Sequence, residues 1–402
     1  MYKLYTNIVL YPRRILKEIE PWIDSKEIIV VTGMRRTGKT TLLKMIYDKV
    51  DSTNKVMLDM ENIIEQRVFD EVDFNNVWLN LASFGIDKKK KAYIFIDEIQ
   101  AAPEVVKVVK YLYDHYDVKF FLTGSSSFYF KNMFPESLAG RKVVFELFPL
   151  SFDEFLTFKE LDISFPEDFE RKESTKTIVL YEKVKKYYEE YLMYGGFPQV
   201  VLADDIRRKE SHIKDIFSSY FEKDVRSLAD FRSMKVFREL MFLILQRVGS
   251  KLNITRLSSE LGVTRETVYS YLSFLEGTYF LFMVPPYSGN VDREVSGAKK
   301  IYVCDTGILN LFGRVGEGRL LENAVYLNLR KYGKLCYYQK RRGREVDFVL
   351  PEAGIAFEVK SRGIRADYDR LRKLAKGMGI DRYFVVSKDY VDEKGIIPAC
   401  AI

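Results

Sequence analysis

The sequence is poor in the residues that build disulfide frameworks and zinc sites. Its 402 residues contain three cysteines and two histidines, and Cys304, Cys336 and Cys400 lie far apart. An odd number of widely spaced cysteines favours neither kind of site and indicates a reducing compartment. Long apolar runs are also missing: residues 240–245 fall far short of the ~20 that a membrane helix needs. Residues 1–10 lack the apolar stretch of a secretory signal, so we expect a cytoplasmic protein with no membrane partner.

The overall composition is that of an ordinary globular protein. Hydrophobic residues make up 47% of the chain and charged residues 30%, which excludes the disordered and fibrous classes. A chain of this length exceeds one hydrophobic core, because domains cluster around roughly 100 to 200 residues. The net charge of +7 is a mild excess that permits contact with nucleic acid without requiring it. We therefore expect two to four domains.

Four short apolar runs predict a parallel α/β layer in the first third of the chain. They are residues 28–31, 56–58, 93–96 and 120–122, and amphipathic stretches separate them. This alternation is typical of buried parallel strands connected by helices. Charged residues without apolar periodicity follow at 157–177 and indicate a boundary, beyond which a helical segment begins.

A glycine-rich loop follows the first predicted strand. The sequence GMRRTGKT at residues 33–40 lies between that strand and a helix-like stretch, the context that a P-loop requires. Gly33 and Gly38 let the backbone turn its amides toward phosphates, Lys39 would reach the β and γ oxygens, and Thr40 would hold Mg²⁺. We expect ATP as the nucleotide. The predicted nucleotide-binding residues are Gly33, Met34, Arg35, Arg36, Thr37, Gly38, Lys39, Thr40 and Thr41.

Two carboxylates end the strand predicted at residues 93–96. Asp97 and Glu98 emerge at the edge where parallel sheets place their ligands. Asp97 would bind the Mg²⁺ shell, and Glu98 would polarise the attacking water. An apolar run that ends in Asp-Glu is common by itself, so the assignment of Asp97 and Glu98 to a nucleotide site depends on the P-loop upstream.

Two further residues are candidates for catalysis at this site. Ser125 follows the strand at 120–122 and is the sensor candidate; the alternative is a serine-rich turn with local backbone bonds. Arg141 could stabilise the γ-phosphate in the transition state, within the chain or across a homo-oligomer, or it could be an ordinary surface arginine. The sequence leaves both pairs of alternatives open and identifies no protein partner.

Several motifs together resemble a known family. The chain resembles, over nearly its whole length, a family of prokaryotic AAA+ ATPases that is abundant in archaea. Members of this family carry a C-terminal domain similar to PD-(D/E)xK nucleases. The motifs are TGMRRTGKTT at 32–41, DEIQ at 97–100, TGSSS at 123–127, LAGR at 138–141, LSFDEF at 150–155, YGGFP at 194–198 and KIYVCDTG at 300–307.

The resemblance implies an α/β fold with four parts. A P-loop AAA+ parallel-sheet domain would occupy residues 1–155 and a helical lid or linker residues 156–230. A winged helix-turn-helix would follow at 231–286, and a restriction-endonuclease-like α/β domain at 287–402. The resemblance does not identify a substrate.

Residues 257–272 have the pattern of a helix-turn-helix, with Thr264 as the N-cap of the second helix. The expected core is Leu257, Leu261, Val263, Val268 and Leu272. The face toward a DNA groove would consist of Arg265, Glu266, Tyr269 and Ser270. That face is weakly basic, with Arg256 and Arg265 as its anchors, so DNA contact and a purely structural role remain open.

The end of the chain predicts a metal-dependent nuclease site. Residues 345–350 and 355–360 flank a turn and should pair as a hairpin, with Leu350 opposite Ile355. One face would be apolar. The other would be polar and set Asp347 across from Glu358, beside Lys360, to gather a second divalent metal. Glu322 would be a fourth member, as the resemblance implies; the alternative is a solvated hairpin face.

Two functions compete at this point. The first is a Mg²⁺-dependent, ATP-hydrolysing ATPase that couples its nucleotide state to a DNA-directed nuclease-like module. The second is an ATP-switched regulatory protein that binds DNA or protein and whose nuclease fold is catalytically idle.

Overall fold

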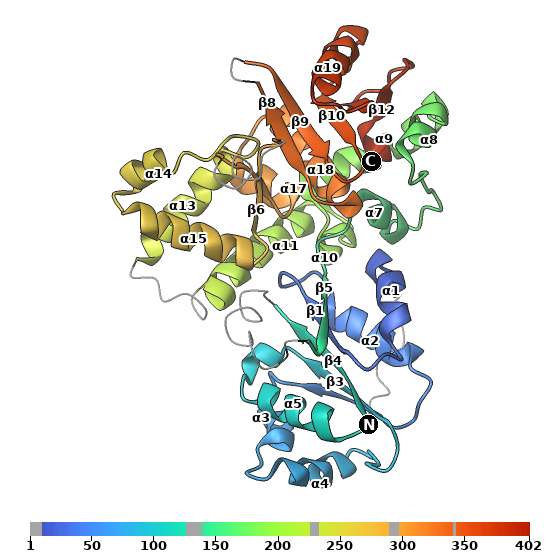
Figure 1. Ribbon diagram of the computed structural model, residues 1–402, viewed down its shortest axis with the longest axis vertical. Coiled ribbons are helices and arrows are strands. Elements are labelled where there is room, and N and C mark those ends of the chain that lie inside the picture. The colour runs from blue at the N-terminus through green and yellow to red at the C-terminus, as the bar shows by residue number, and fades with distance from the viewer. Residues whose placement is uncertain (1–9, 126–137, 139, 226–232, 289–296, 341–342) are drawn as a thin grey trace. The chain divides into compact units, whose positions relative to one another are not determined.

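The computed structural model describes residues 10–125, 138, 140–225, 233–288, 297–340 and 343–402. The chain forms two compact units (Figure 1). The first comprises Met1–Phe148 with Gly277–Tyr279, and the second comprises Pro149–Glu276 with Phe280–Ile402. The predicted division of residues 156–402 into three further domains stays a prediction.

The first unit contains a five-stranded parallel sheet in the order β2-β3-β4-β1-β5. Its strands are β1 (Ile28–Thr32), β2 (Lys55–Asp59), β3 (Ala92–Asp97), β4 (Val118–Gly124) and β5 (Lys142–Glu146). The four predicted apolar runs lie in β1 to β4, so the predicted parallel layer is confirmed. The strand β5 was missed; three of its five side chains are partly exposed and two are exposed, so it lacks a buried apolar run.

Alternate residues of the strands enter two different cores. Val30 and Ile94 pack with α5 (Val105–His115), whereas Ile29 and Phe121 pack with α2 (Lys39–Lys49). Because both faces of the sheet are covered, its strands read as continuous apolar runs. The remaining helical elements are α1 (Arg14–Ile19), η1 (Glu20–Trp22), α3 (Ile63–Gln66), η2 (Arg67–Phe69), η3 (Phe74–Asn76), α4 (Val77–Ala82) and η4 (Ile99–Ala101).

The second unit begins with helices and ends in a mixed sheet (Figure 1). Its first helices are α7 (Phe152–Phe158), α8 (Phe169–Ser174), α9 (Ile178–Tyr194), α10 (Pro198–Val201), α11 (Ile206–Ser219), η5 (Tyr220–Val225) and α13 (Met234–Gln246). The pair α14 (Ile254–Leu261) and α15 (Arg265–Gly277) follows, then the antiparallel strands β6 (Leu281–Val284) and β7 (Lys300–Val303). The next helices are α17 (Thr306–Ile308), η6 (Leu309–Gly313), α18 (Glu317–Leu329) and η7 (Arg330–Tyr332).

The last sheet has the order β12-β11-β10-β9-β8. Its elements are β8 (Cys336–Gln339), β9 (Glu345–Leu350), β10 (Ile355–Lys360), α19 (Arg365–Gly377), β11 (Arg382–Ser387), β12 (Ile396–Pro398) and η8 (Ala399–Ala401). β8, β9 and β10 pair antiparallel, while β11 and β12 continue in parallel from β10.

The predicted hairpin register is confirmed for the pairs nearest the turn, but the second face of the hairpin is not polar as predicted. Leu350 pairs with Ile355 and Phe348 with Phe357. Val349 and Ala356, on the face expected to be polar, are fully buried in a core that includes residues of α19. The helix covers this face, which the local pattern of the two strands does not reveal.

Two of the sequence motifs meet in the interior of the second unit. The buried Asp305 accepts hydrogen bonds from the backbone N–H groups of Gly196, at 2.7 Å, and Ile308, at 3.0 Å. Gly195 has φ +80, and a Cβ there would lie 2.2 Å from both Asp305 carboxylate oxygens. Gly195 therefore leaves room for a buried carboxylate that anchors both segments, whereas a Cβ at Gly196 would lie 2.4 Å from the carbonyl oxygen of Leu150.

None of the helices in the described part of the chain combines the length and the apolar character of a membrane span.

Candidate functional site

The P-loop lies between β1 and α2, as predicted. Gly33 is required because a Cβ there would lie 2.1 Å from the carbonyl oxygen of Leu147. Gly38 has φ +98 and precedes the first residue of α2, so the helix N-terminus and its free amides face the loop. The Lys39 ammonium donates to the carbonyls of Gly33 and Met34, each at 3.0 Å. The lysine that would bind phosphates is therefore hydrogen-bonded to carbonyl groups of the P-loop itself.

Arg13 fastens this loop to the rest of the unit, and sequence reasoning missed it. Its guanidinium donates to the carbonyl of Thr37 at 2.9 Å and to that of Phe148 at 2.8 Å. The Thr37 hydroxyl donates to the Met34 carbonyl at 2.8 Å. Since Arg13 lies 20 residues before the loop, no local motif connects the two.

Asp97 is held by two hydroxyl groups. Thr40 Oγ1 donates to Asp97 Oδ2 at 2.7 Å, and the Thr123 hydroxyl donates to the other carboxylate oxygen. Burial raises the pKa of Asp97, and the hydrogen bonds from Thr123 and Thr40 oppose that rise. The structure therefore brings Thr40 and Asp97 together as the sequence predicted, and it adds Thr123 to them.

Glu98 is fixed in a strained backbone conformation. Its φ of +50 lies in the left-handed region, which glutamate rarely adopts. Its backbone N–H donates to Thr123 Oγ1 at 3.0 Å, so one hydroxyl contacts both carboxylate residues. Strain of this kind is costly and is concentrated at functional sites.

Ser125 connects to Glu98 through Gln100. The Gln100 amide nitrogen donates to the Glu98 carboxylate and to Ser125 Oγ, the latter at 3.1 Å. Ser125 is buried, and its own N–H lies 3.4 Å from Gln100 Oε1. The structure thus brings the sensor candidate near Glu98, although its role stays a prediction. Gln100 was part of a quoted motif but had no assigned role.

Arg141 is not brought to this site within the chain. Its carbonyl accepts from the N–H of Ile28, at the start of β1, whereas the P-loop follows the end of that strand. The two positions are separated by about 16 Å along the strand. The guanidinium pairs with Asp114 at 2.8 Å. The structure therefore does not place Arg141 beside the P-loop, and its role, within the chain or across a homo-oligomer, stays a prediction.

The residues around Asp97 fit a magnesium ion bound together with phosphates. A hydroxyl and a carboxylate in contact are hard oxygen donors, and Mg²⁺ is usually held by one or two carboxylates with substrate oxygens and water. Asp59 pairs with Asp97 in the register of β2 and β3 and adds a second carboxylate at the same strand ends. Thr40 and Asp97 would hold the ion directly or through water.

Three carboxylates of the second unit surround one lysine, and this group is here called the carboxylate pocket: Glu322 on α18, and Glu345 and Asp347 on β9. The ammonium of Lys300, on β7, pairs with Glu345, and it lies 3.3 Å from Glu322 Oε1 and 3.9 Å from Asp347 Oδ1. Tyr302 donates to Glu322 Oε1 at 2.6 Å. Asp347 also accepts from the backbone N–H of Val359 at 2.8 Å.

Glu358 and Lys360 form a neighbouring charged group; burial and then the Asp347 charge raise the pKa of Glu358. Glu358 Oε1 accepts from Lys360 at 2.8 Å and from Arg370 of α19 at 2.9 Å. Within the described ranges no three acidic, histidine or cysteine side chains are arranged to hold a metal ion. The structure therefore does not arrange Glu322, Asp347 and Glu358 as a metal site, and this site stays a prediction. Lysine and arginine side chains pair with these carboxylates instead.

Comparisons with known proteins agree with the P-loop found in the first unit. Residues 25–156 match the model of an AAA domain, and residues 185–317 and 317–398 match two domains of unknown function, DUF8612 and DUF4143. The chain is 30% identical over 345 residues to the uncharacterized protein MJ1544 of Methanocaldococcus jannaschii, covering 83% of this chain and 74% of the relative. The chain belongs to the family of MJ1544.

Two more proteins are similar to this chain. An uncharacterized protein of Haemophilus influenzae is 28% identical over 363 residues, covering 86% of each chain. The Walker-type ATPase PABY2304 of Pyrococcus abyssi has a TM-score of 0.48 and 15% identity, covering 76% of this chain and 96% of that one. The match of residues 25–156 to the AAA domain model identifies them as an AAA-type P-loop ATPase domain.

The helix pair α14 and α15 has the predicted core and the predicted exposed face. Leu257, Leu261, Val268 and Leu272 are buried, and Val263 is half-buried. The Thr264 hydroxyl accepts from the N–H of Thr267 at 3.2 Å, which confirms the cap. The exposed residues are Arg265, Glu266, Tyr269 and Ser270. Arg256, one of the two expected anchors, pairs with Glu260 at 2.8 Å, which reduces the basic character of this face.

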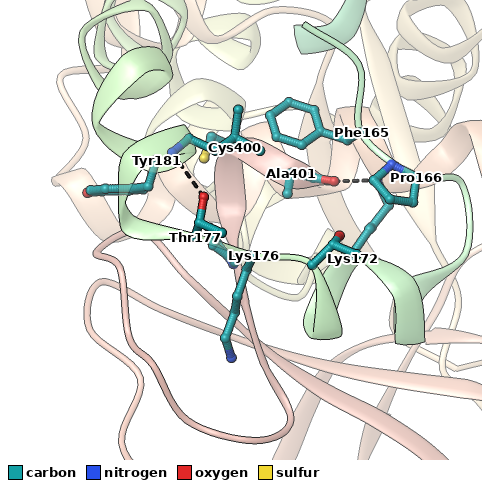
Figure 2. A pocket seen from close by; sticks show the side chains of 11 residues that line it. Phe165, Pro166, Lys172, Lys176, Thr177, Tyr181, Cys400 and Ala401 are labelled. Carbon is teal, nitrogen blue, oxygen red and sulfur yellow. Dashed lines mark hydrogen bonds between the residues drawn. The ribbon is translucent and has the colours of Figure 1, made fainter.

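A shallow pocket in the second unit, which sequence reasoning missed, has a structural explanation. Figure 2 shows the side chains that line it, among them Phe165, which precedes α8, Lys172 of α8 and Cys400 of η8. Lys172 donates to the Ala401 carbonyl, and Lys176 donates to the Ile396 carbonyl at 2.7 Å. Burial lowers the pKa of Lys172 to about 8. Lys172 therefore connects α8 to the residues near 401, and Lys176 connects the segment between α8 and α9 to β12.

Proposed function

We propose that this protein is a Mg²⁺-dependent ATP hydrolase that acts as a molecular switch, in which the nucleotide state of the AAA domain governs the binding activity of the second unit. The observation that carries the proposal is the assembly at the ends of β1, β3 and β4. There the P-loop lysine, a hydroxyl-bound Asp97 and a strained Glu98 lie around one position for a triphosphate.

Each residue has a defined task in the proposed reaction. The amides of the P-loop and the α2 N-terminus bind the phosphates, and Lys39 exchanges its two carbonyl partners for the β and γ oxygens. Mg²⁺ supplies charge neutralisation on those oxygens when bound. Thr40 and Asp97 orient toward it, and Glu98 accepts a hydrogen bond from the attacking water.

The network around Glu98 positions that carboxylate. Thr123 fixes the Glu98 backbone, and Gln100 contacts both the Glu98 carboxylate and Ser125. A base that only orients water must be held in place, because a displacement of 1 Å can cost about 100-fold in rate. We therefore assign Thr123, Gln100 and Ser125 as positioning residues.

For the second unit we favour binding over cleavage. The nuclease-coupled alternative requires carboxylates that are open to a metal, whereas Lys300 lies among Glu322, Glu345 and Asp347. The exposed face of α15 is a candidate for the binding surface, with DNA as one partner that its arginine and tyrosine could contact.

The test is a paired assay on the full chain. The wild type should release phosphate from ATP only with Mg²⁺, and it should leave plasmid DNA intact with Mg²⁺ or Mn²⁺. Absence of ATP turnover would contradict the hydrolase proposal. Metal-dependent nicking that is lost in Asp347→Ala would instead favour the nuclease-coupled alternative.

A further inference from the structure

The carboxylate pocket is unusual because a cation from the chain itself lies in it. Glu322, Glu345 and Asp347 come from α18 and β9 and are each only partly exposed, between 18% and 29%. Lys300 is 4% exposed and approaches them from β7, a third element. Its position is therefore set by the packing of the second unit and not by a local turn.

The charges in this pocket do not balance. Three carboxylates share one ammonium group at the distances given above. The formal charges of these four groups therefore leave negative charge in excess. Burial alone would lower the pKa of Lys300, but Glu322, Asp347 and Glu345 outweigh it and raise the pKa. The ammonium therefore stays charged over the whole physiological range.

The walls of the pocket leave the carboxylates little freedom to turn away. A Cβ added at Gly249 would lie 3.0 Å from Glu322 Oε2, and Tyr302 donates to Glu322 Oε1. Asp347 is held by the N–H of Val359. Carboxylate oxygens fixed in this way are the donors that Mn²⁺ and Mg²⁺ prefer.

We propose that Lys300 is a built-in cation that replaces a divalent metal ion in the carboxylate pocket, and that its ammonium is what keeps metal out of the second unit. Lys360 pairs directly with Glu358 in the neighbouring charged group and forms no ion pair with Asp347, although its charge helps to lower the pKa of that carboxyl. The inference goes beyond ATP hydrolysis and does not depend on it. It explains in physical terms why the second unit would bind without cutting.

The test uses the nucleotide-free full chain and Mn²⁺ as the probe, with bound ion followed by electron paramagnetic resonance. Lys300→Met keeps the length of the side chain and removes its charge. We expect it to gain one Mn²⁺ site, bound about tenfold or more tightly than by the wild type, on the scale of one charge pair at ~4 Å. The double variant Lys300→Met with Glu322→Gln should lose that site. Lys360→Met, which removes one cation from the neighbouring group, should gain none.

Stability gives a second readout if Lys300→Met folds poorly. Three carboxylates without their cation repel one another, so its melting temperature should fall without metal and recover when Mn²⁺ is added, and EDTA should reverse the recovery. Two results would overturn the proposal. One is a wild type that binds Mn²⁺ in this pocket as tightly as Lys300→Met does. The other is a Lys300→Met protein that Mn²⁺ neither binds nor stabilises. Loss of ATP turnover would leave both readouts unaffected.

Discussion

Removal of the Thr123 hydroxyl should damage the nucleotide site without altering the shape of the core. Thr123 is fully buried at the end of β4, and valine has nearly the same shape. In Thr123→Val, Asp97 loses a donor and the Glu98 N–H loses its acceptor. A hydrogen bond to a charged group contributes about 1.5 to 3 kcal/mol, and an unsatisfied buried N–H costs about 1 to 3 kcal/mol. We expect kcat/KM for Mg-ATP to fall about ten- to a hundredfold.

The pH profile separates this effect from general damage. Burial raises the pKa of Asp97, and the bond from Thr123 partly offsets that rise. Without the bond the pKa rises further, so at a given acidic pH more of Asp97 is protonated and unable to bind Mg²⁺. The acidic limb of the activity profile should therefore move to higher pH in Thr123→Val.

Thr123→Ser is the matched control, because serine retains the hydroxyl and should keep the pH profile close to that of the wild type. The assay is steady-state phosphate release from pH 5 to 9 at saturating Mg²⁺. A folded Thr123→Val protein with unchanged kcat/KM and an unmoved acidic limb would refute the role of this hydroxyl.

Two further predictions concern the core of the second unit and the assembly of the protein. Gly195→Ala should lower the free energy of unfolding by about 2 to 5 kcal/mol, because the new Cβ adds left-handed strain and displaces Asp305. The control Gly379→Ala, at φ +74 with no atom within 4 Å of a Cβ, should lower it by about 1 kcal/mol. Equal losses of the two variants in urea denaturation would refute the steric clash between a Cβ at residue 195 and Asp305. If Arg141 acts across a homo-oligomer, mixing Arg141→Ala with Glu98→Gln chains should restore ATP turnover, and no recovery, or a monomer in light scattering, would remove that role.

Much of the AAA domain could be predicted from local sequence. The strands of a parallel sheet are buried on both faces, so their apolar runs are visible, and the P-loop and Asp97-Glu98 follow such runs directly. Arg13 could not be predicted, because its partners are backbone carbonyls 24 and 135 residues away. A backbone acceptor leaves no residue-specific signal in the sequence.

The second unit was less predictable for the same physical reason. The hairpin register follows from the turn between β9 and β10, and it was correct. The chemistry around Asp347 depends on Lys300, which belongs to another element 47 residues earlier. Lys300 stood in a quoted motif, but only the fold reveals which carboxylates it pairs with. A sequence pattern of acidic residues cannot show whether a lysine or a metal lies among them.

The most direct test of the central claim compares ATP binding with ATP turnover in Glu98→Gln. The amide has the size of the carboxylate but cannot accept a proton from water, so the variant should bind Mg-ATP with an affinity near that of the wild type. Its single-turnover hydrolysis should be slower by about a hundredfold or more. The measurement is calorimetric binding together with single-turnover phosphate release on the same preparation. Normal turnover in a variant that binds ATP normally would contradict the assignment of Glu98, and with it the proposed mechanism of hydrolysis.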